Sequence, residues 1–186
     1  MNNKFRFNQY KTIHSILFIL GQLGGKSDFH KIFKILYFAD QKHLVEFGMP
    51  ITGDSYTAMQ NGPVPSKSYD IFKFLRGETT WQKPQMDYSQ FFEVENWNIL
   101  VKKQDADMDE LADSNIEYLM TSIKENENLS FSELSLKSHE LAWKNAINNE
   151  MSFTDIAIEG KASEGMVEYI KFNLENQSTN IRYAIG

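Results

Sequence analysis

A small set of acidic and imidazole side chains could together support acid–base or metal chemistry. Asp40 and His43 lie three residues apart, so a helix would present them on one face, and Asp54 follows shortly afterwards. His139 supplies another imidazole later in the chain. If the fold brought these groups together, they could bind a metal ion that activates water. A metal-assisted hydrolase is therefore one function to test.

Several observations favour structural roles for these residues instead. The sequence has no HExxH or HxH pattern, and no GxSxG, SxxK, GxGxxG or P-loop motif. It has no cysteine, which removes thiolate catalysis and Cys-ligated zinc. We expect Asp40 to bond to the following loop, His43 to complement a helix C-terminal dipole, and Asp54 to bind loop backbone donors. This interpretation predicts no catalytic residue, no metal and no cofactor.

The composition predicts an ordinary globular protein of one domain. The chain has 186 residues, of which 41% are hydrophobic and 13% aromatic, enough to build a core. A formal charge of -6 argues against broad binding to phosphate backbones, which requires clustered Lys and Arg. The lack of cysteine suits either a reducing cytoplasm or indifference to redox state, and we expect a cytoplasmic protein.

The N-terminal segment resembles a signal peptide in part. Basic residues precede the apolar run 16–20, but His14 and Ser15 interrupt the pattern and no Ala-x-Ala-like cleavage site follows. The apolar residues fall at helical spacing, which favours a first helix there. No other segment approaches the roughly 18 apolar residues that a membrane helix requires, so we expect no membrane association.

Helical periodicity and capping residues predict that most of the chain is helical. The expected helices begin near Asn8, Ser27 or Asp28, Ser66, the acidic stretch 105–110, Ser130, His139 and Ser163. Gly24, Gly48 and Gly77 are expected to end the first three. Residues 1–175 would then form the domain, and residues 176–186 a flexible C-terminal tail.

The remaining patterned segments predict strands. Residues 55–59 could form one short strand within a Gly- and Pro-rich loop, and residues 91–103 a β-hairpin that turns at Asn96 and Trp97. Residues 155–158 are ambiguous between strand and turn. The expected fold class is α+β, a mainly helical single domain with a small antiparallel sheet.

The two short helices expected after Ser130 allow a helix-turn-helix over residues 132–148. That stretch carries only Lys137 and Lys144 as basic residues, whereas recognition helices usually offer more cations to phosphates and bases. Nucleic-acid binding is therefore not expected, and a DNA-binding regulator of its own operon stays an alternative.

A family resemblance rests on residues at fixed spacing between positions 36 and 69. They are LYFAD at 36–40, HL at 43–44, Gly48, PITGD at 50–54, Tyr56, AM at 58–59, GPVP at 62–65 and Tyr69. A weaker block holds His139, Glu140 and Trp143, in which the imidazole can lie beside the indole at helical spacing. The order and spacing resemble the Panacea domain, also called the antitoxin SocA-like domain, which is seen in phage-associated and toxin–antitoxin proteins.

This resemblance implies a non-enzymatic domain that neutralises a toxin encoded beside it by direct contact. Within the family, delivery of the toxin to a cellular protease as an adaptor is a further mode. The resemblance implies partner-binding or loop-organising roles for Asp40, His43, Gly53, Asp54, Tyr56, Gly62, Pro63, Tyr69, His139 and Trp143. We expect the glycines and Pro63 to set backbone shape, and Tyr56 with neighbouring polar groups to face the partner.

Overall fold

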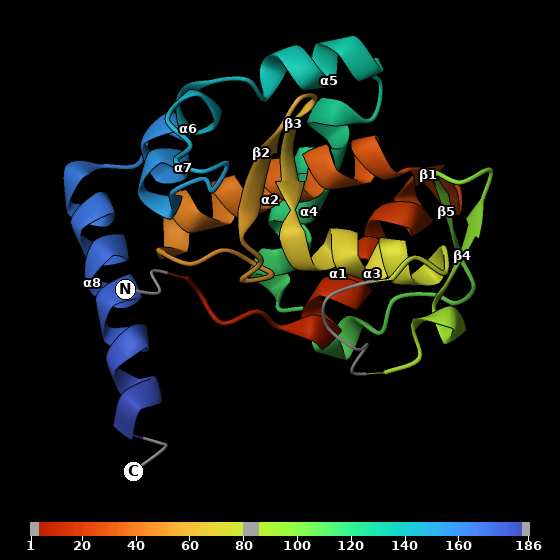
Figure 1. The fold of residues 1–186 in the computed structure, drawn as a ribbon, viewed down its shortest axis with the longest axis horizontal. Coiled ribbons are helices and arrows are strands. Elements are labelled where there is room, and N and C mark those ends of the chain that lie inside the picture. Colours follow the sequence, from red (N-terminus) through yellow and green to blue (C-terminus); the bar gives the residue numbers. More distant parts are fainter. Residues whose placement is uncertain (1–3, 80–85, 184–186) are drawn as a thin grey trace.

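The computed structural model describes residues 4–79 and 86–183, which form a mainly helical α+β fold as predicted (Figure 1). The helices are α1 (Gln9–Gln22), α2 (Phe29–Phe47), α3 (Ser66–Leu75), α4 (Asp113–Asn126), α5 (Phe131–Lys137), α6 (Leu141–Lys144), α7 (Phe153–Glu159) and α8 (Glu164–Tyr183). The strands are β1 (Lys26–Asp28), β2 (Tyr56–Met59), β3 (Gly62–Pro65), β4 (Phe92–Glu95) and β5 (Ile99–Lys102). None of the helices in this described part is long and apolar enough to cross a membrane.

Helix α2 runs through the middle of the molecule and contributes to both parts of the hydrophobic core. One part joins α2 to α1, α3, α4 and the strands β4 and β5. The other part joins α2 to β2, α6, α7 and α8. The β2–β3 hairpin lies across α2, and α5 lies above the tip of the hairpin (Figure 1). Helix α2 therefore contacts many of the other elements directly, among them α1, α4, α5, α7 and β3.

The ends of the first two helices follow the predicted local chemistry. The Asn8 side chain accepts a hydrogen bond from the Lys11 amide at 3.0 Å, and Asp28 accepts from the Lys31 amide at 2.9 Å. Gly48 ends α2 with a φ of 69°, a left-handed conformation that glycine adopts without strain. These predicted caps are confirmed.

The predicted hairpin is confirmed as strands β4 and β5. Glu95 pairs with Ile99, and the turn residues Asn96 and Trp97 have φ values of 46° and 69°. Asn98 completes the turn, so the loop between the paired residues has three residues, two of them with left-handed φ values. Strand β1, which the sequence did not predict, pairs with β5 and completes a sheet in the order β1-β5-β4.

Two segments differ from the sequence expectation. Residues 62–65 form strand β3 opposite β2, although Pro63 and Pro65 argue against a strand. Residues 155–158 lie within helix α7, where Ser152 accepts a hydrogen bond from the Thr154 amide at 3.2 Å. The expected strand or turn there is wrong, because the cap was overlooked.

The C-terminal helix extends beyond the expected end of the last helix. Met166 donates its amide to the predicted cap Ser163 at 3.2 Å, and α8 then continues to Tyr183. Helical backbone thus covers most of the segment 176–186, whose last residues lie outside the described part. The division of the chain at residue 176 stays a prediction.

Candidate functional site

The carboxylate of Asp40 ties α2 to the loop that follows it. Its Oδ1 accepts from the Thr52 amide at 3.1 Å, and its Oδ2 accepts from the Thr52 hydroxyl at 2.7 Å and the Tyr56 hydroxyl at 2.8 Å. The side chain is fully buried among these donors. The expected bond from Asp40 to the loop is therefore confirmed.

The carboxylate of Asp54 caps helix α3, although Asp54 precedes that helix by several residues in the sequence. Its oxygens accept from the Lys67 amide at 2.9 Å, the Ser68 amide at 2.8 Å and the Ser68 hydroxyl at 2.8 Å. These amides belong to the first turn of α3, whose donors have no partner within the helix. The Asp54 amide in turn donates to the Thr52 hydroxyl at 3.1 Å, which links the two carboxylate sites.

Both carboxyl groups titrate above their ordinary range. Burial raises the pKa of Asp40 and of Asp54 from 3.8 to about 6, and the hydrogen bonds that they accept act in the opposite direction. The buried hydroxyl of Tyr56 beside Asp40 has a pKa well above 10.0, because burial and the neighbouring carboxylate disfavour its ionised form.

His43 connects the end of α2 to α4. Its Nδ1 lies 2.7 Å from the Met49 carbonyl, and its Nε2 lies 3.2 Å from both the Ser114 hydroxyl and the Asn115 side-chain amide. Burial lowers the pKa of His43, so the imidazole is neutral near pH 7. Because a neutral ring adds little to the helix dipole, its role is this connection, which differs from the dipole role expected from the sequence.

His139 and Trp143 form a stacked pair beside the β2–β3 hairpin. Their ring centroids are 4.1 Å apart, and the indole Nε1 donates to the Met59 carbonyl at 2.9 Å. Burial lowers the pKa of His139, and Lys34 and Lys144 lower it further. The stacked pair thus fastens the start of α6 to the tip of the hairpin.

The possible hydrolase site does not assemble. Asp40 and Asp54 bind separate sets of hydroxyl and amide donors, and His43 and His139 contact different segments. Within residues 4–79 and 86–183, no group of three or more Asp, Glu or His side chains is arranged to hold a metal ion. The metal-assisted hydrolase built on these four residues is therefore wrong.

Two glycines of the loop permit close backbone approaches. Gly53 has a φ of 70°, and a Cβ there would lie 2.2 Å from the Arg6 carbonyl oxygen. Gly62 has a φ of 101°, and a Cβ there would lie 2.4 Å from the Ser138 hydroxyl. The next carbonyl, of Pro63, accepts from Lys34 Nζ at 2.9 Å. The shape-setting role expected for these residues agrees with these contacts.

Tyr56 does not face the surface. Its side chain is 1% exposed and packs against Tyr37 with ring centroids 5.1 Å apart, so the expectation that it meets a partner is wrong. Tyr69 is partly buried, packs edge-on against Phe33 and carries the Lys73 amine 4.5 Å above its ring. Of the two tyrosines, only Tyr69 lies where a ligand could contact it.

Glu159, which sequence reasoning missed, joins α7 to two other helices. Its Oε1 accepts from the Tyr37 hydroxyl and the Gln41 side-chain amide, both at 2.9 Å, and its Oε2 accepts from the Ala142 amide at 2.9 Å. Ala142 belongs to α6, so this carboxylate caps that helix. A correct prediction of a helix over residues 153–159 is the one sequence signal that could have indicated a capping role for Glu159.

The segment considered for a helix-turn-helix offers few free cations. Lys137 donates to the Asn126 side chain at 2.7 Å and lies over the Phe38 ring, and Lys144 lies 3.7 Å from the Glu140 carboxylate. Helix α6 has 4 residues, too few to fill a major groove. The structure gives this alternative no support.

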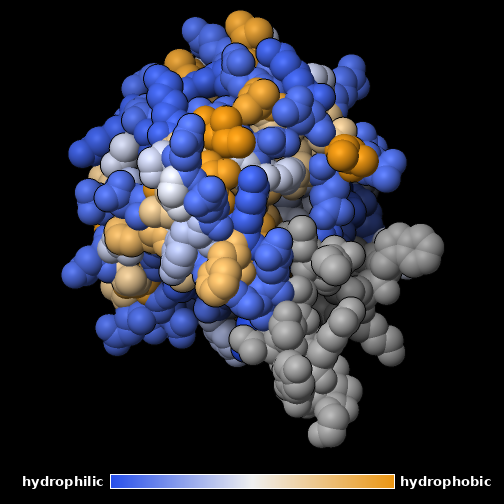
Figure 2. Space-filling view, turned by 90° about the vertical axis from the view of Figure 1, so that its left-hand side faces the viewer, coloured by the Kyte–Doolittle hydropathy of each residue, from blue (hydrophilic) through white to orange (hydrophobic). Residues whose placement is uncertain are grey.

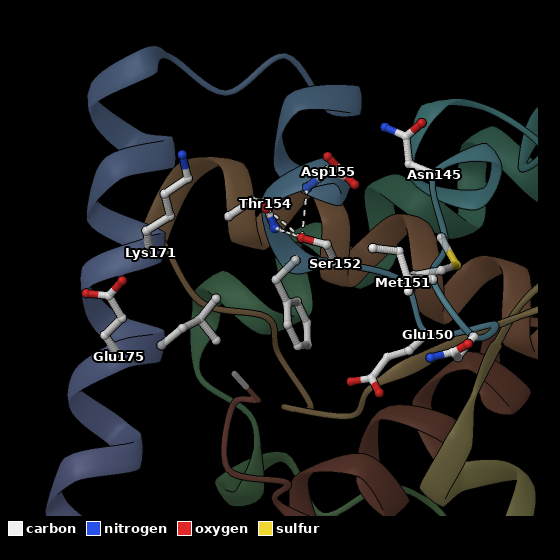
Figure 3. A pocket seen from close by; sticks show the side chains of 12 residues that line it. Asn145, Glu150, Met151, Ser152, Thr154, Asp155, Lys171 and Glu175 are labelled. Atoms are coloured by element: carbon white, nitrogen blue, oxygen red, sulfur yellow. Dashed lines mark hydrogen bonds between the residues drawn. The ribbon is translucent and has the colours of Figure 1, made fainter. Parts of the chain in front are cut away.

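A cleft of about 570 Å³ lies between α8 and residues 145–155 (Figure 3). Ser152 points its hydroxyl at the backbone of α7, as the dashed lines show, and Glu150 pairs with Lys4 at 3.0 Å. Lys171 and Glu175 approach from α8 on the other side. Ser152 is thus a helix cap and Glu150 part of a surface ion pair, so these two groups have structural roles.

The fold and these contacts define a helical scaffold whose signature residues hold a loop and a short hairpin in place. Residues 32–144 match the family described as antitoxin SocA-like, Panacea domain. The match covers more than half of the 186 residues, from within α2 to the end of α6. The chain therefore belongs to this family, which implies a toxin as its partner. Neither the curated proteins nor the solved structures contain a match.

Removing the Asp40 carboxylate should destabilise the fold strongly. In Asp40→Ala, the Thr52 amide and the Tyr56 hydroxyl stay buried without an acceptor, and we expect a loss of about 3–5 kcal/mol in the free energy of unfolding. Denaturant titration measures it. Asp70→Ala is the control, because the Asp70 side chain is only partly buried and pairs with Lys73 within one turn; we expect a change below about 0.5 kcal/mol. Similar losses in both variants would contradict the role of Asp40.

The raised pKa of Asp54 predicts an unusual pH dependence. Because the folded state holds this proton more tightly than the unfolded chain, wild type should gain stability relative to Asp54→Asn as the pH falls from about 6 to about 4. The free energies of unfolding of both proteins across this range test the prediction. A relative loss of stability in wild type would show instead that the hydrogen bonds to Asp54 outweigh its burial.

Proposed function

We propose that this protein neutralises a toxin encoded beside it by binding the toxin directly in the cytoplasm. The observation that carries this proposal is the family match over residues 32–144. Its residue-level support is that the signature carboxylates accept buried structural hydrogen bonds, as expected of a binding scaffold. The protein then acts through shape and surface, and no chemical step is required of it.

The toxin-binding surface would lie outside the buried signature residues. Exposed apolar side chains surround the tip of the hairpin and the helices above it: Phe131 and Leu136 on α5, Leu141 on α6, and Ile147 just beyond it. Leu136 and Ile147 are each 75% exposed, although burial would stabilise them. Apolar side chains of this kind form the cores of protein interfaces, which supports a partner at this surface.

The side of the molecule that carries α8 offers a useful comparison. There, Figure 2 shows small hydrophobic areas interrupted by hydrophilic residues. Phe172 is 62% exposed and belongs to α8, whereas the proposed surface is formed by α5, α6 and the residue just beyond α6. It provides an exposed apolar side chain with no proposed role in toxin binding.

Co-expression with the neighbouring gene product tests the proposal. We expect wild type to restore growth and to purify as a complex, and the double variant Leu136→Asp/Ile147→Asp to bind the toxin at least tenfold more weakly, because a buried carboxylate replaces each apolar contact. Phe172→Asp is the control and should behave as wild type. If wild type forms no complex with the toxin and does not restore growth, the proposed function is overturned.

The same experiment distinguishes direct blocking from delivery to a protease. If binding alone neutralises the toxin, its lifetime in the cell should be unchanged or longer when this protein is present. If the protein is an adaptor, the toxin should disappear faster in its presence. Pulse-chase measurement of the toxin, with and without the double variant, separates the two modes.

A further inference from the structure

A pocket of about 450 Å³ lies between α2, the β2–β3 hairpin, α3 and α5. Its walls are largely aromatic, formed by Phe29, Phe33, Tyr69 and Phe131. The tip of the hairpin contributes polar groups from Gln60 and Asn61, both exposed. Its size suits a few side chains or a small ligand, and it lies apart from the hydrogen bonds of Asp40 and Asp54.

The charges that line this pocket are positive. Lys34 and Arg76 line it, and no Asp or Glu does among the described residues. Lys34 is 1% exposed, and among residues 4–79 and 86–183 its Nζ donates one hydrogen bond, to the Pro63 carbonyl, whereas an ammonium has three donors. Arg76 is paired with Glu78, so Lys34 is the less compensated charge. In a protein of charge -6, this concentration of cations favours a negatively charged ligand.

Two buried atoms beside the pocket have no hydrogen-bond partner in the described part of the chain. One is Nε of Arg76, a donor, and the other is Nδ1 of His30. The opposite nitrogen of His30, Nε2, lies 3.3 Å from the Asn61 carbonyl and 3.0 Å from the Ser135 hydroxyl, and it donates to the carbonyl in the tautomer that carries the proton on Nε2. Burial lowers the pKa of His30 to about 4, so the ring is neutral near pH 7 and its Nδ1 is an acceptor in that tautomer. A bound peptide segment could supply a partner for each atom, an acceptor for Arg76 Nε and an N–H for His30 Nδ1.

The hairpin itself limits how a peptide can bind. Pro63 and Pro65 have no backbone N–H, and the Pro63 carbonyl already accepts from Lys34. Strand β3 therefore lacks the alternating donors that an added strand would use. A peptide at this edge has to be held by its side chains in the pocket.

We propose that this pocket binds a carboxylate side chain of the partner protein, carried on a peptide segment beside an apolar residue. The carboxylate pairs with Lys34, and the apolar neighbour packs on the aromatic walls. The ring of Phe131, which is 52% exposed and stacks on His30 at 3.9 Å, shifts to admit the segment. That the partner is a protein rests on the proposed function.

The experiment uses the full chain and a small peptide probe, and it requires no toxin. Acetyl-Glu-Phe-amide is titrated into ¹⁵N-labelled protein, with acetyl-Gln-Phe-amide as the uncharged probe. We expect the acidic probe to shift amide signals of α2 and the hairpin tip, and to bind at least fivefold more tightly than the amide probe. In Lys34→Met the affinity should fall at least fivefold, because the side chain keeps its volume and loses its charge.

Lys31→Met is the matched control, because Lys31 lies one turn earlier on α2 and donates to the Glu127 carbonyl, away from the pocket. It should bind the acidic probe within twofold of wild type. Thermal unfolding confirms that both variants are folded. Equal binding of the two probes, or unchanged binding in Lys34→Met, would overturn the inference. Binding of AMP without binding of the acidic peptide would also overturn it and assign the pocket to a nucleotide.

The pH dependence of binding gives an independent readout. Burial lowers the pKa of Lys34 to about 7, and the titratable groups near it, His30 and His139, are also shifted toward their neutral forms. A bound carboxylate stabilises the ammonium, so affinity should be about tenfold higher at pH 6 than at pH 8.5. Lys34→Met should remove this difference. A wild-type affinity that is the same at both pH values would count against the pairing.

Measurement of the toxin complex separates the two proposals. If Lys34→Met binds the toxin as wild type does and the acidic probe does not bind, the pocket inference fails and the proposed function stands. If the probe binds as expected and no toxin complex forms with wild type, the proposed function fails and the carboxylate site stands. If the inference is right, Lys34→Met weakens both interactions and Lys31→Met weakens neither.

Discussion

The buried carboxylate of Asp40 is the interaction on which the arrangement of this protein depends. Removing a carboxylate from water costs free energy unless hydrogen-bond donors surround it. Thr52 and Tyr56 supply these donors from the loop. Because Thr52 also accepts from the Asp54 amide, the position of one carboxylate fixes the next. Asp54 then fixes the start of α3. The path of the chain from α2 to α3 thus follows from a single requirement, that two desolvated carboxylates keep their donors.

These hydrogen bonds also explain why residue types typical of catalysis serve a scaffold here. The lone pairs of Asp40 and Asp54 already accept from amides and hydroxyls, so little capacity is left for a metal or a substrate. Their raised pKa values reflect burial, which perturbs structural carboxyl groups as well as catalytic ones. A loop held this firmly loses little conformational freedom when a partner binds, which benefits a protein-binding surface.

The features that could be predicted from the sequence are those decided by neighbouring residues. The caps at Asn8 and Asp28 and the αL end at Gly48 depend on local geometry, and the sequence located them correctly. Strand β3 was missed because its prolines oppose a ladder, and only an edge position facing α2 makes them acceptable. Tyr56 was misplaced because an aromatic residue in a loop gives no local sign of the buried carboxylate that it meets.

Lys34 shows how the cost of burial can indicate function. It stands between apolar residues on α2 and is almost fully buried, and its lowered pKa shows that the folded state disfavours its charge. A methionine would fill the same space without that cost but would leave the Pro63 carbonyl without its donor, so the structural role of the lysine is this one hydrogen bond. Glu159 is a useful contrast, because its oxygens accept from Tyr37, Gln41 and Ala142. Among the residues that the structure describes, Lys34 Nζ donates to one carbonyl, and a ligand that brings a negative charge would offset the cost of burying the ammonium.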